Sequence, residues 1–258
     1  MGHPQLDLTS KTAVVIGGTS GIGLAIAKGL AVAGANVVPS GRRAELAKVV
    51  AADIERGGGK ALAHPADVTS RASLEDLLRA SIATFGSVEI LVNSAGRTKR
   101  TPTLQVPDSE WNEIIETNLT GTLRACQVFG QHMIDRGYGR IINIASLSSF
   151  VSLFEVAAYS ASKAAVASLT KSLAIEWAKH GVCVNAIAPG VFRTDLNTAL
   201  LDGTPRGQEF LSRTPMQRFG KLDELVGAAV FLASDSASFV TGHVLAVDGG
   251  FLASGVNQ

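Results

Sequence analysis

The chain has 258 residues, of which 46% are hydrophobic and 17% charged, so it can bury a sizeable core and is not a disordered segment. Its formal net charge of +1 gives no reason to expect nucleic acid or an anionic membrane as a partner. Polar residues interrupt its apolar runs well before the ~18 residues that a membrane span needs.

Short apolar runs and helical patterns alternate along the chain. The first strand is expected at 12–16, directly before a glycine-rich turn and a helix. Further strands are expected at 36–40, 60–64, 88–92, 140–144, 182–188 and 244–247. Helices are expected at 43–56, 70–85, 108–133 with Asp108 as its cap, 157–179 and 222–233. This alternation predicts an α/β fold: a Rossmann-type doubly wound parallel sheet with helices on both faces, in a single domain over residues 1–258.

Residues 191–215 stand apart from this alternation. The segment contains prolines and glycines and no clear periodicity, so we expect an irregular loop. Long loops in compact domains are usually lids or binding loops. Because it follows a strand, it is expected to lie over the ligand site and to bring Phe192, Leu196 or Arg213 towards a substrate when it closes. The alternative is a surface excursion with no part in catalysis.

The glycines at 17, 21 and 23 follow the first expected strand and precede a helix. Glycines at this point let the backbone turn sharply and approach a pyrophosphate, and the helix N-terminus favours the phosphate charge. A glycine turn needed only for tight strand–helix packing is the alternative. The stretch lacks the lysine of a mononucleotide P-loop, so it favours a dinucleotide.

Tyr159 and Lys163 are four residues apart, which places them on one helical face, one turn from each other. Free tyrosine has a pKa of about 10, and a nearby ammonium would lower the pKa of Tyr159 and make it a usable proton carrier. An exposed pair on a surface helix would give the same spacing.

Two further polar residues could join this pair. Ser146 ends the strand before the Tyr159 helix, where its hydroxyl could hold a substrate oxygen, and Ser148 and Ser149 compete for that role. Asn118 lies inside an expected helix, where its amide could fix a bend or an ordered water near Lys163, or simply face solvent.

These motifs resemble those of the short-chain dehydrogenases/reductases over essentially the whole chain. The shared order and spacing comprise Gly17-x-x-x-Gly21-x-Gly23, Asp67, Asn93-Ser94-Ala95-Gly96, Asn118, Ser146, Tyr159-x-x-x-Lys163, Pro189-Gly190 and Asp248-Gly249-Gly250. Two positions depart from the family pattern: Ile16 stands where threonine is usual, and Ser94 where a second asparagine is usual. Both are compatible with nucleotide binding.

The resemblance implies an oxidoreductase in which a nicotinamide cofactor exchanges a hydride with a carbinol carbon. Its catalytic tetrad would be Asn118, Ser146, Tyr159 and Lys163. Tyr159 would carry the proton, Lys163 would also bind the nicotinamide ribose, Ser146 would orient the substrate oxygen and Asn118 would support a water path. Asp67 and Val68 would flank the adenine, Asn93 and Gly96 the ribose, and Thr194 the nicotinamide amide. The remaining implied cofactor contacts are Gly17, Thr19, Ser20, Gly21, Ile22, Gly23, Ala95, Pro189, Gly190 and Val191.

The end of the second strand bears on the choice between NAD and NADP. The position where NAD enzymes of the family carry an acid falls on Gly41, followed by Arg42 and Arg43. No carboxylate there would repel a 2′-phosphate, and two guanidiniums could pair with it. We therefore expect NADP to be preferred, with NAD possible; two solvated arginines at a helix start are the alternative.

Within the family, the chain resembles the gluconate 5-dehydrogenases and related sugar-acid dehydrogenases. The resemblance rests on Arg97-Thr98-Lys99-Arg100, Arg213-Thr214-Pro215, residues 227–232 and the ending from Gly242-His243 to Leu252. Arg97, Lys99 and Arg100 lie just past a strand's carboxyl end, where they could meet a substrate carboxylate, and a solvated loop of basic residues is the alternative. Ser148 and Phe192 are further expected substrate contacts. A 3-oxoacyl-[acyl-carrier-protein] reductase and a nucleotide-binding regulator without turnover are the competing functions, and the intact tetrad argues against the regulator.

The rest of the sequence limits location and partners. Residues 1–12 lack the pattern of a signal peptide, and the five histidines and two cysteines form neither a metal-spaced cluster nor a disulfide framework. We expect a cytoplasmic protein without a metal. Small residues on the 157–179 helix, together with the family resemblance, favour a homodimer or homotetramer built on close helix packing.

Overall fold

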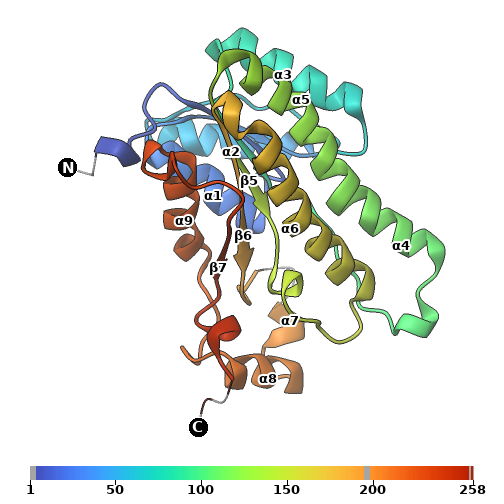
Figure 1. The fold of residues 1–258 in the computed structure, drawn as a ribbon. Coiled ribbons are helices and arrows are strands. Elements are labelled where there is room, and N and C mark those ends of the chain that lie inside the picture. Colours follow the sequence, from blue (N-terminus) through green and yellow to red (C-terminus); the bar gives the residue numbers. More distant parts are fainter. Residues whose placement is uncertain (1–3, 195–197, 256, 258) are drawn as a thin grey trace.

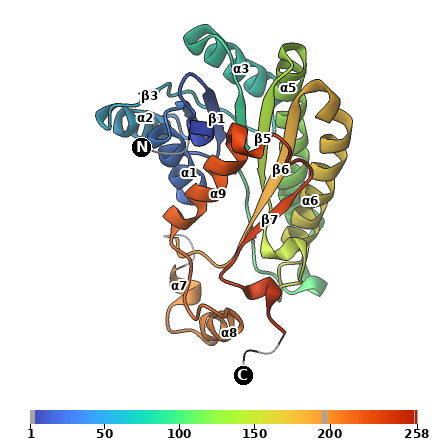
Figure 2. The same cartoon turned by 60° about the vertical axis from the view of Figure 1, so that its left-hand side comes forward.

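The computed structural model describes residues 4–194, 198–255 and 257, which form one seven-stranded sheet flanked by helices (Figures 1 and 2). The strand order is β3-β2-β1-β4-β5-β6-β7, and every neighbouring pair is parallel. The strands are β1 Thr12–Ile16, β2 Asn36–Ser40, β3 Lys60–Ala61, β4 Ile90–Asn93, β5 Gly139–Ile144, β6 Val182–Pro189 and β7 Val244–Val247. The predicted doubly wound fold is confirmed.

The central strands are buried along their whole length because helices cover both faces of the sheet. All five residues of β1 and all eight of β6 are buried, as their continuous apolar runs predict. The long helices are α1 Gly21–Val32, α2 Ala44–Arg56, α3 Arg71–Phe85, α4 Asp108–Ile115, α5 Gly121–Arg136, α6 Ala157–Trp177 and α9 Val226–Ala233. None of the helices in the described ranges has both the length and the apolar character to cross a membrane.

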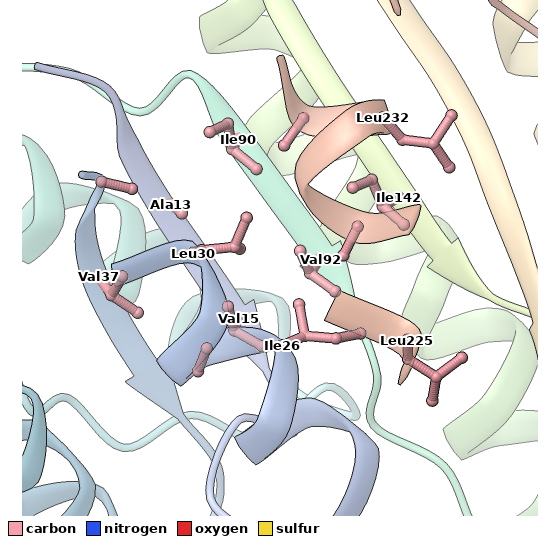
Figure 3. Packing of buried hydrophobic residues seen from close by; sticks show 14 of the residues in the cluster. Ala13, Val15, Ile26, Leu30, Val37, Ile90, Val92, Ile142, Leu225 and Leu232 are labelled. Atoms are coloured by element: carbon pink, nitrogen blue, oxygen red, sulfur yellow. The ribbon is translucent and has the colours of Figure 1, made fainter. Parts of the chain in front are cut away.

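Two hydrophobic clusters separate the helices by face. One joins α1, α2 and α9 to the sheet, with Val15, Ile26 and Leu232 at its centre (Figure 3). The other joins α3, α5 and α6 to the opposite face through Leu74, Phe129 and their neighbours. Because helices fill both faces of the sheet, a ligand is expected at the ends of the strands. At their carboxyl ends the strands lead into the loops that bind ligands in folds of this type.

The third strand is shorter than predicted, two residues in place of 60–64. The Val37 carbonyl of β2 still accepts a hydrogen bond from the Leu62 N–H, at 3.0 Å. Alternate residues of a strand face the same neighbour, so the next group of β2 on this side belongs to Pro39, which has no N–H to offer. The ladder therefore stops, and the chain leaves the sheet.

The helix expected at 108–133 is interrupted and extended. It begins as α4 with Pro107, not Asp108, in the cap position, passes through one π-helical turn, η3 (Glu116–Thr120), and continues as α5 to Arg136. The π-turn contains Asn118, so the helical hydrogen-bond pattern is locally distorted at this residue. The helix expected at 222–233 likewise starts as a 3₁₀ turn, Leu222–Leu225, before α9.

Residues 191–215 are not irregular throughout, which corrects the prediction. They contain α7 (Thr198–Leu201) and α8 (Pro205–Arg213). The Thr204 side chain accepts a hydrogen bond from the Gly207 N–H and Pro205 occupies the first turn, a standard helix start that the prolines and glycines of the segment obscured. Both helices lie beyond the carboxyl ends of β6 and β7 (Figures 1 and 2).

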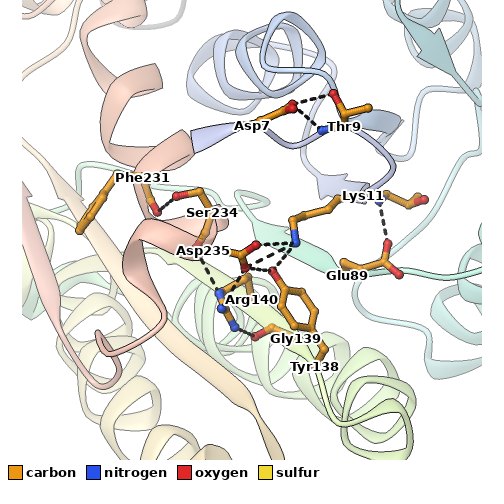
Figure 4. A network of polar contacts seen from close by, with 11 residues as sticks. Asp7, Thr9, Lys11, Glu89, Tyr138, Gly139, Arg140, Phe231, Ser234 and Asp235 are labelled. Atoms are coloured by element: carbon orange, nitrogen blue, oxygen red, sulfur yellow. Dashed lines mark hydrogen bonds and ion pairs between the residues drawn. The ribbon is translucent and has the colours of Figure 1, made fainter. Parts of the chain in front are cut away.

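A polar cluster closes the opposite, amino-end edge of the sheet (Figure 4). The Lys11 ammonium donates to the Tyr138 hydroxyl at 2.7 Å, and that hydroxyl donates to Asp235 at 2.9 Å. Lys11 and Arg140 also lie over the Tyr138 ring, 4.3 and 4.5 Å from its centroid. The cluster ties the segment before β1 to the turn after α9.

Replacing Tyr138 by phenylalanine tests this cluster. The substitution keeps the ring for both cations but removes the hydroxyl that joins Lys11 to Asp235, so we expect the free energy of unfolding to fall by about 1 kcal/mol. Urea denaturation measures the change. Lys48→Ala, which breaks an exposed pair with Glu45, is the control and should leave the transition in place. Equal transitions for both variants would contradict a stabilising role for the hydroxyl.

Candidate active site

The glycine turn after β1 packs directly against the turn after β4. A side-chain carbon at Gly17 would lie 2.6 Å from the Ala95 N, and one at Gly23 would lie 2.2 Å from the Gly17 O. Gly17 and Gly21 also have positive φ angles, 83° and 52°. Only glycine meets both demands, so the sequence makes this turn tight and brings two strand ends together.

The N-terminus of α1 in this turn fits a dinucleotide pyrophosphate. Ser20 is the N-cap residue but makes no side-chain capping bond, so its hydroxyl leaves the first N–H groups of α1, including those of Ile22 and Gly23, to other acceptors. Thr194 lies across the turn, with its methyl 3.9 Å from where a Gly21 side chain would begin. Pro189 and Gly190 lead from β6 to this point, and the Gly190 backbone packs on Asp248.

The end of β2 reaches the same turn. The Arg43 guanidinium lies 3.5 Å from the Ser20 hydroxyl, and a side chain at Gly41 would begin 3.1 Å from the Thr19 hydroxyl. The structure therefore brings the expected cofactor-specificity position beside the glycine turn, with a guanidinium there and no side chain at Gly41. The Ser40 carbonyl at the end of β2 accepts hydrogen bonds from the N–H groups of the glycine turn after β1. The Ile16 carbonyl at the end of β1 accepts one from the turn after β4.

Asp67 and Val68, expected beside the adenine, are held by neighbouring residues. The Asp67 carboxylate accepts hydrogen bonds from the Thr69 N–H and hydroxyl at 2.9 and 2.8 Å. These bonds, with a smaller contribution from the Arg42 charge, lower the pKa of Asp67. Val68 is buried against Gly121 of α5. The carboxylate and Arg42 thus share one region at the edge of the expected adenine site.

The Asn93 side chain lies in a buried hydrogen-bond network beneath the expected ribose site. Its side-chain amide donates to Asn143 at 2.9 Å and to Cys126 at 3.3 Å, and Asn143 in turn donates to Thr170 of α6 at 2.9 Å. This buried network ties β4, β5, α5 and α6 together beneath the site. The side-chain hydrogen bonds of Asn93 therefore hold the sheet and its helices together.

Asn118 joins three segments of the site. Its carbonyl oxygen accepts from the Arg97 N–H at 2.8 Å, and its amide donates to the Arg97 carbonyl at 2.9 Å and to the Ser162 hydroxyl at 3.0 Å. The side chain is fully buried. Gly96 is adjacent, since a side chain there would begin 3.4 Å from the Asn118 oxygen and 3.7 Å from the Lys163 nitrogen. No local pattern in the sequence indicates that Ser162, between Tyr159 and Lys163, is the third partner of Asn118.

Lys163 is buried, and its ammonium donates to the Ile144 carbonyl at the end of β5, at 2.6 Å. Burial lowers the pKa of Lys163 to about 8. The side chain therefore remains mostly charged at neutral pH, yet it is far closer to losing its proton than a surface lysine is.

The Tyr159 side chain lies near Ser146 and Lys163, and the Lys163 nitrogen is 5.8 Å from the Tyr159 ring centroid. Burial raises the pKa of Tyr159, and the nearby Ser146 hydroxyl opposes that rise. This reverses the direction that the spacing alone predicted, because loss of water around the phenol outweighs its polar contacts. The Ser146 hydroxyl also accepts from the Ser148 N–H at 3.1 Å.

The basic residues expected near the substrate are held in ion pairs, whereas the Ser148 hydroxyl has no partner among the described residues. Arg97, Lys99 and Arg100 are paired with Glu113, Glu110 and Glu155, each at 2.6 Å, which explains how this basic loop is held. The Ser148 hydroxyl is buried without a hydrogen-bond partner among the described residues.

The Phe192 ring is buried in the core against Gly220, and the residue also lines a cavity at the ends of β6 and β7. Arg213 pairs with Glu209 along α8, and Leu196 lies outside the described residues.

A cavity of about 160 Å³ lies at the ends of β6 and β7, beside Gly190, Asp248 and the Arg218–Glu224 ion pair. Ser146, Tyr159 and Lys163 are not among the residues that line it. In the described part of the chain, no three His, Cys, Asp or Glu side chains are grouped to hold a metal ion. The geometry of the tetrad, not this cavity, defines the candidate site.

The family model described as "Enoyl-(Acyl carrier protein) reductase" matches residues 17–252. The chain belongs to the short-chain dehydrogenase/reductase family, and it is an oxidoreductase acting on CH–OH groups.

Among individual proteins, it is 40% identical to "Gluconate 5-dehydrogenase" of Gluconobacter oxydans, over 98% of this chain and 100% of that protein. A solved structure of a putative NAD(P)-dependent gluconate 5-dehydrogenase from Beutenbergia cavernae, with bound NADP at low occupancy, is 45% identical with a TM-score of 0.92, and covers 97% of this chain and 100% of that one. A gluconate 5-dehydrogenase from Burkholderia cenocepacia, solved with NADP and tartrate, is 39% identical with a TM-score of 0.93, over 97% and 98% of the two chains. The predicted resemblance to this group is confirmed.

The buried Lys163 makes unfolding depend on pH. Its pKa is about 8 in the folded chain and about 10.5 when unfolded, so between these values the unfolded chain binds more protons and stability rises with pH. From about pH 7 to about pH 9.5, the free energy of unfolding of the cofactor-free protein should rise relative to that of Lys163→Met by on the order of 2 kcal/mol. Denaturant unfolding across this range measures the difference. A constant difference between the two proteins would contradict a lowered pKa of Lys163.

Proposed function

We propose that this protein transfers a hydride between NADP(H) and a secondary alcohol or ketone of a small sugar acid such as gluconate. The observation that carries the proposal is the meeting of Asn118, Ser146, Tyr159 and Lys163 beside the glycine turn, at the carboxyl ends of β1, β4 and β5. The relatives named for gluconate oxidation support the substrate class.

Each member of the tetrad has a task that its contacts support. When bound, the nicotinamide cofactor supplies the hydride chemistry. Tyr159 takes the hydroxyl proton in oxidation and returns it in reduction, while Ser146, near the phenol, orients the substrate oxygen. Lys163 places its positive charge near Tyr159. It would also bind a hydroxyl of the nicotinamide ribose. Asn118 fixes the π-turn against the loop at Arg97 and supports the proton path.

The pyrophosphate would be held by the glycine turn from Gly17 to Gly23, with Ser20 and Ile22 at the start of α1. Arg42 and Arg43 would hold the 2′-phosphate, Asp67 and Val68 the adenine, and Asn93, Ala95 and Gly96 would line the ribose, Asn93 through its backbone. Val191 and Thr194 would meet the nicotinamide. The approach of Arg43 to Ser20 supports a phosphate beside both residues, and NADP is preferred for that reason.

The segment 191–215 is proposed as the substrate loop of this single domain. Its contact with the glycine turn through Thr194, and the position of α8 beyond the strand ends, support this role. The protein is proposed to work in the cytoplasm as a homodimer or homotetramer. The exposed face of α6, with Ala161, Ala164 and Ser168, supports close packing of a second copy, and light scattering would read the mass.

A substrate panel separates the candidate reactions. Sugar acids, neutral polyols and acetoacetyl thioesters would be assayed with both cofactors. Turnover of sugar acids with NADP supports the proposal, turnover of thioesters alone supports a 3-oxoacyl-[acyl-carrier-protein] reductase, and cofactor binding without any turnover supports a regulator.

Tyr159→Phe removes only the hydroxyl that carries the proton. Turnover should fall by on the order of 10² or more, while NADP binding stays close to the wild-type value, because the ring and Lys163 remain. Steady-state kinetics and a fluorescence titration with NADPH measure the two quantities. Near-normal turnover in this variant would mean that another group carries the proton.

Arg42→Ala tests the cofactor preference. Loss of a charged hydrogen bond to the 2′-phosphate should weaken NADP by on the order of 1.5–3 kcal/mol and leave NAD nearly unchanged. Arg56→Ala, at the far end of α2 and paired with Asp53, is the control and should affect neither cofactor. An equal loss for both cofactors, or a wild-type preference for NAD, would exclude this role for Arg42.

A further inference from the structure

Three segments far apart in the sequence meet beside the start of α6: the loop after β4, the turn before α6, and α8. The Arg100 guanidinium pairs with the Glu155 carboxylate at 2.6 Å and lies 5.8 Å from the centre of the Phe154 ring. The Thr101 N–H donates to the Glu155 carbonyl at 2.8 Å. Arg206 of α8 donates to the Phe154 carbonyl at 3.3 Å. The turn at 154–155 is therefore held from both sides by arginine-bearing segments.

The backbone at this turn is unusual. Glu155 has a φ of 61°, in the left-handed region that residues other than glycine rarely adopt. Such a conformation is kept only where surrounding contacts enforce it, and these are often found at binding sites. Here the Arg100 ion pair and the Thr101 bond enforce it.

The helix α8 is also fixed in place. The Arg206 guanidinium lies 5.4 Å from the Phe210 ring centroid, and Phe210 packs against Phe251 near the C-terminal end, 6.4 Å between ring centres. Arg206 is half-buried, so its position is set by the Phe210 ring and the Phe154 carbonyl, not by solvent. The helix presents one arginine to the turn at a defined place.

The charges of this cluster do not balance. Burial, and after it the Arg100 charge, lower the pKa of Arg206, while Glu155 and Glu209 act in the other direction. Glu209 is paired with Arg213, and within the described chain Arg206 makes no ion pair of its own. The Glu155 carboxylate is paired with Arg100, so Arg206 is left as one positive charge in excess in this cluster.

We infer that Arg100 and Arg206 form a carboxylate-binding subsite at the mouth of the active site, with the turn at 154–155 holding Arg100 through the Glu155 carboxylate and Arg206 through the Phe154 carbonyl. The inference rests on the proposed function and names the part of the substrate that this protein recognises. A guanidinium has five N–H donors in a planar fork that matches a carboxylate, and Arg206 spends one of them on a backbone carbonyl. The carboxylate of the substrate would supply the second negative charge.

The location suits this task. Glu155 precedes Tyr159 by four residues, and the buried Val156 at the start of α6 joins the two. An acid held by Arg100 and Arg206 at one end of a short polyhydroxylated chain would present a carbon further along that chain to Tyr159 and Ser146. A neutral polyol would lack the charged contact. The subsite therefore selects acids over polyols of the same length.

The test compares two Arg206 variants in the full-length protein. Arg206→Gln removes the charge but keeps hydrogen-bond donors, and Arg206→Lys keeps the charge. Gluconate and tartrate would be titrated calorimetrically onto the enzyme–NADP complex, and KM and kcat would be measured for gluconate. Arg136→Gln, an exposed arginine at the amino-end side of the sheet, controls for net charge.

We expect Arg206→Gln to weaken gluconate and tartrate binding and raise the gluconate KM by on the order of tenfold or more, with kcat and NADP affinity little changed. Arg206→Lys should recover part of the loss. A structural role for Arg206 would instead lower kcat and NADP affinity together. The subsite is excluded if Arg206→Gln binds both acids as tightly as the wild type, if Arg136→Gln loses as much, or if the wild type binds neither acid. Wild-type turnover of sugar acids with an unaffected Arg206→Gln would remove this inference and leave the proposed function standing.

Discussion

The side-chain amide of Asn118 is the contact on which the geometry of the site depends. It closes a two-point bond with the backbone at Arg97 and a third bond with Ser162 of α6, so the loop after β4, the π-turn and the catalytic helix cannot move independently. An amide suits this place because it both donates and accepts, whereas a carboxylate would leave the Arg97 carbonyl and the Ser162 hydroxyl without a donor. The π-turn is the local distortion that aims the amide at these partners.

Burial around the tetrad works on its two titratable groups in opposite senses. It raises the pKa of Tyr159 and lowers the pKa of Lys163 to about 8. Both shifts disfavour the charged form, and they separate two pKa values whose ordinary values, 10.0 and 10.5, lie close together. The nearby Ser146 hydroxyl acts against the shift of the phenol. Tyr159 therefore keeps its proton more firmly than free tyrosine does, whereas Lys163 gives its proton up more readily than a surface lysine.

Much of the fold and of the tetrad could be predicted from the sequence, because both depend on short-range patterns. The buried strands are continuous apolar runs, and Tyr159 and Lys163 are related by one helical turn. The errors come from contacts between distant residues. The third strand ends early because of Pro39 on its neighbour, and the phenol pKa depends on burial by several segments. The roles of Asn93 and Ser162 depend on partners 50 and 44 residues away, which no local pattern reveals. Pro205 and Thr204, in contrast, form a local helix-start pattern that is typical of the beginning of a helix such as α8.

The cluster of Lys11, Tyr138 and Asp235 has a consequence for the order in which the chain acquires its structure. Lys11 and Asp235 are separated by 224 positions, so this contact requires nearly the whole polypeptide to have left the ribosome. The segment before β1 emerges first and is anchored among the last, and β1 itself sits between strands that follow it in the chain. Contacts of such long sequence separation slow folding, because the loss of chain freedom precedes the stabilisation. Until Asp235 arrives, the Lys11 ammonium and the Tyr138 hydroxyl are one partner short, and the amino-end edge of the nascent sheet is the last to be secured.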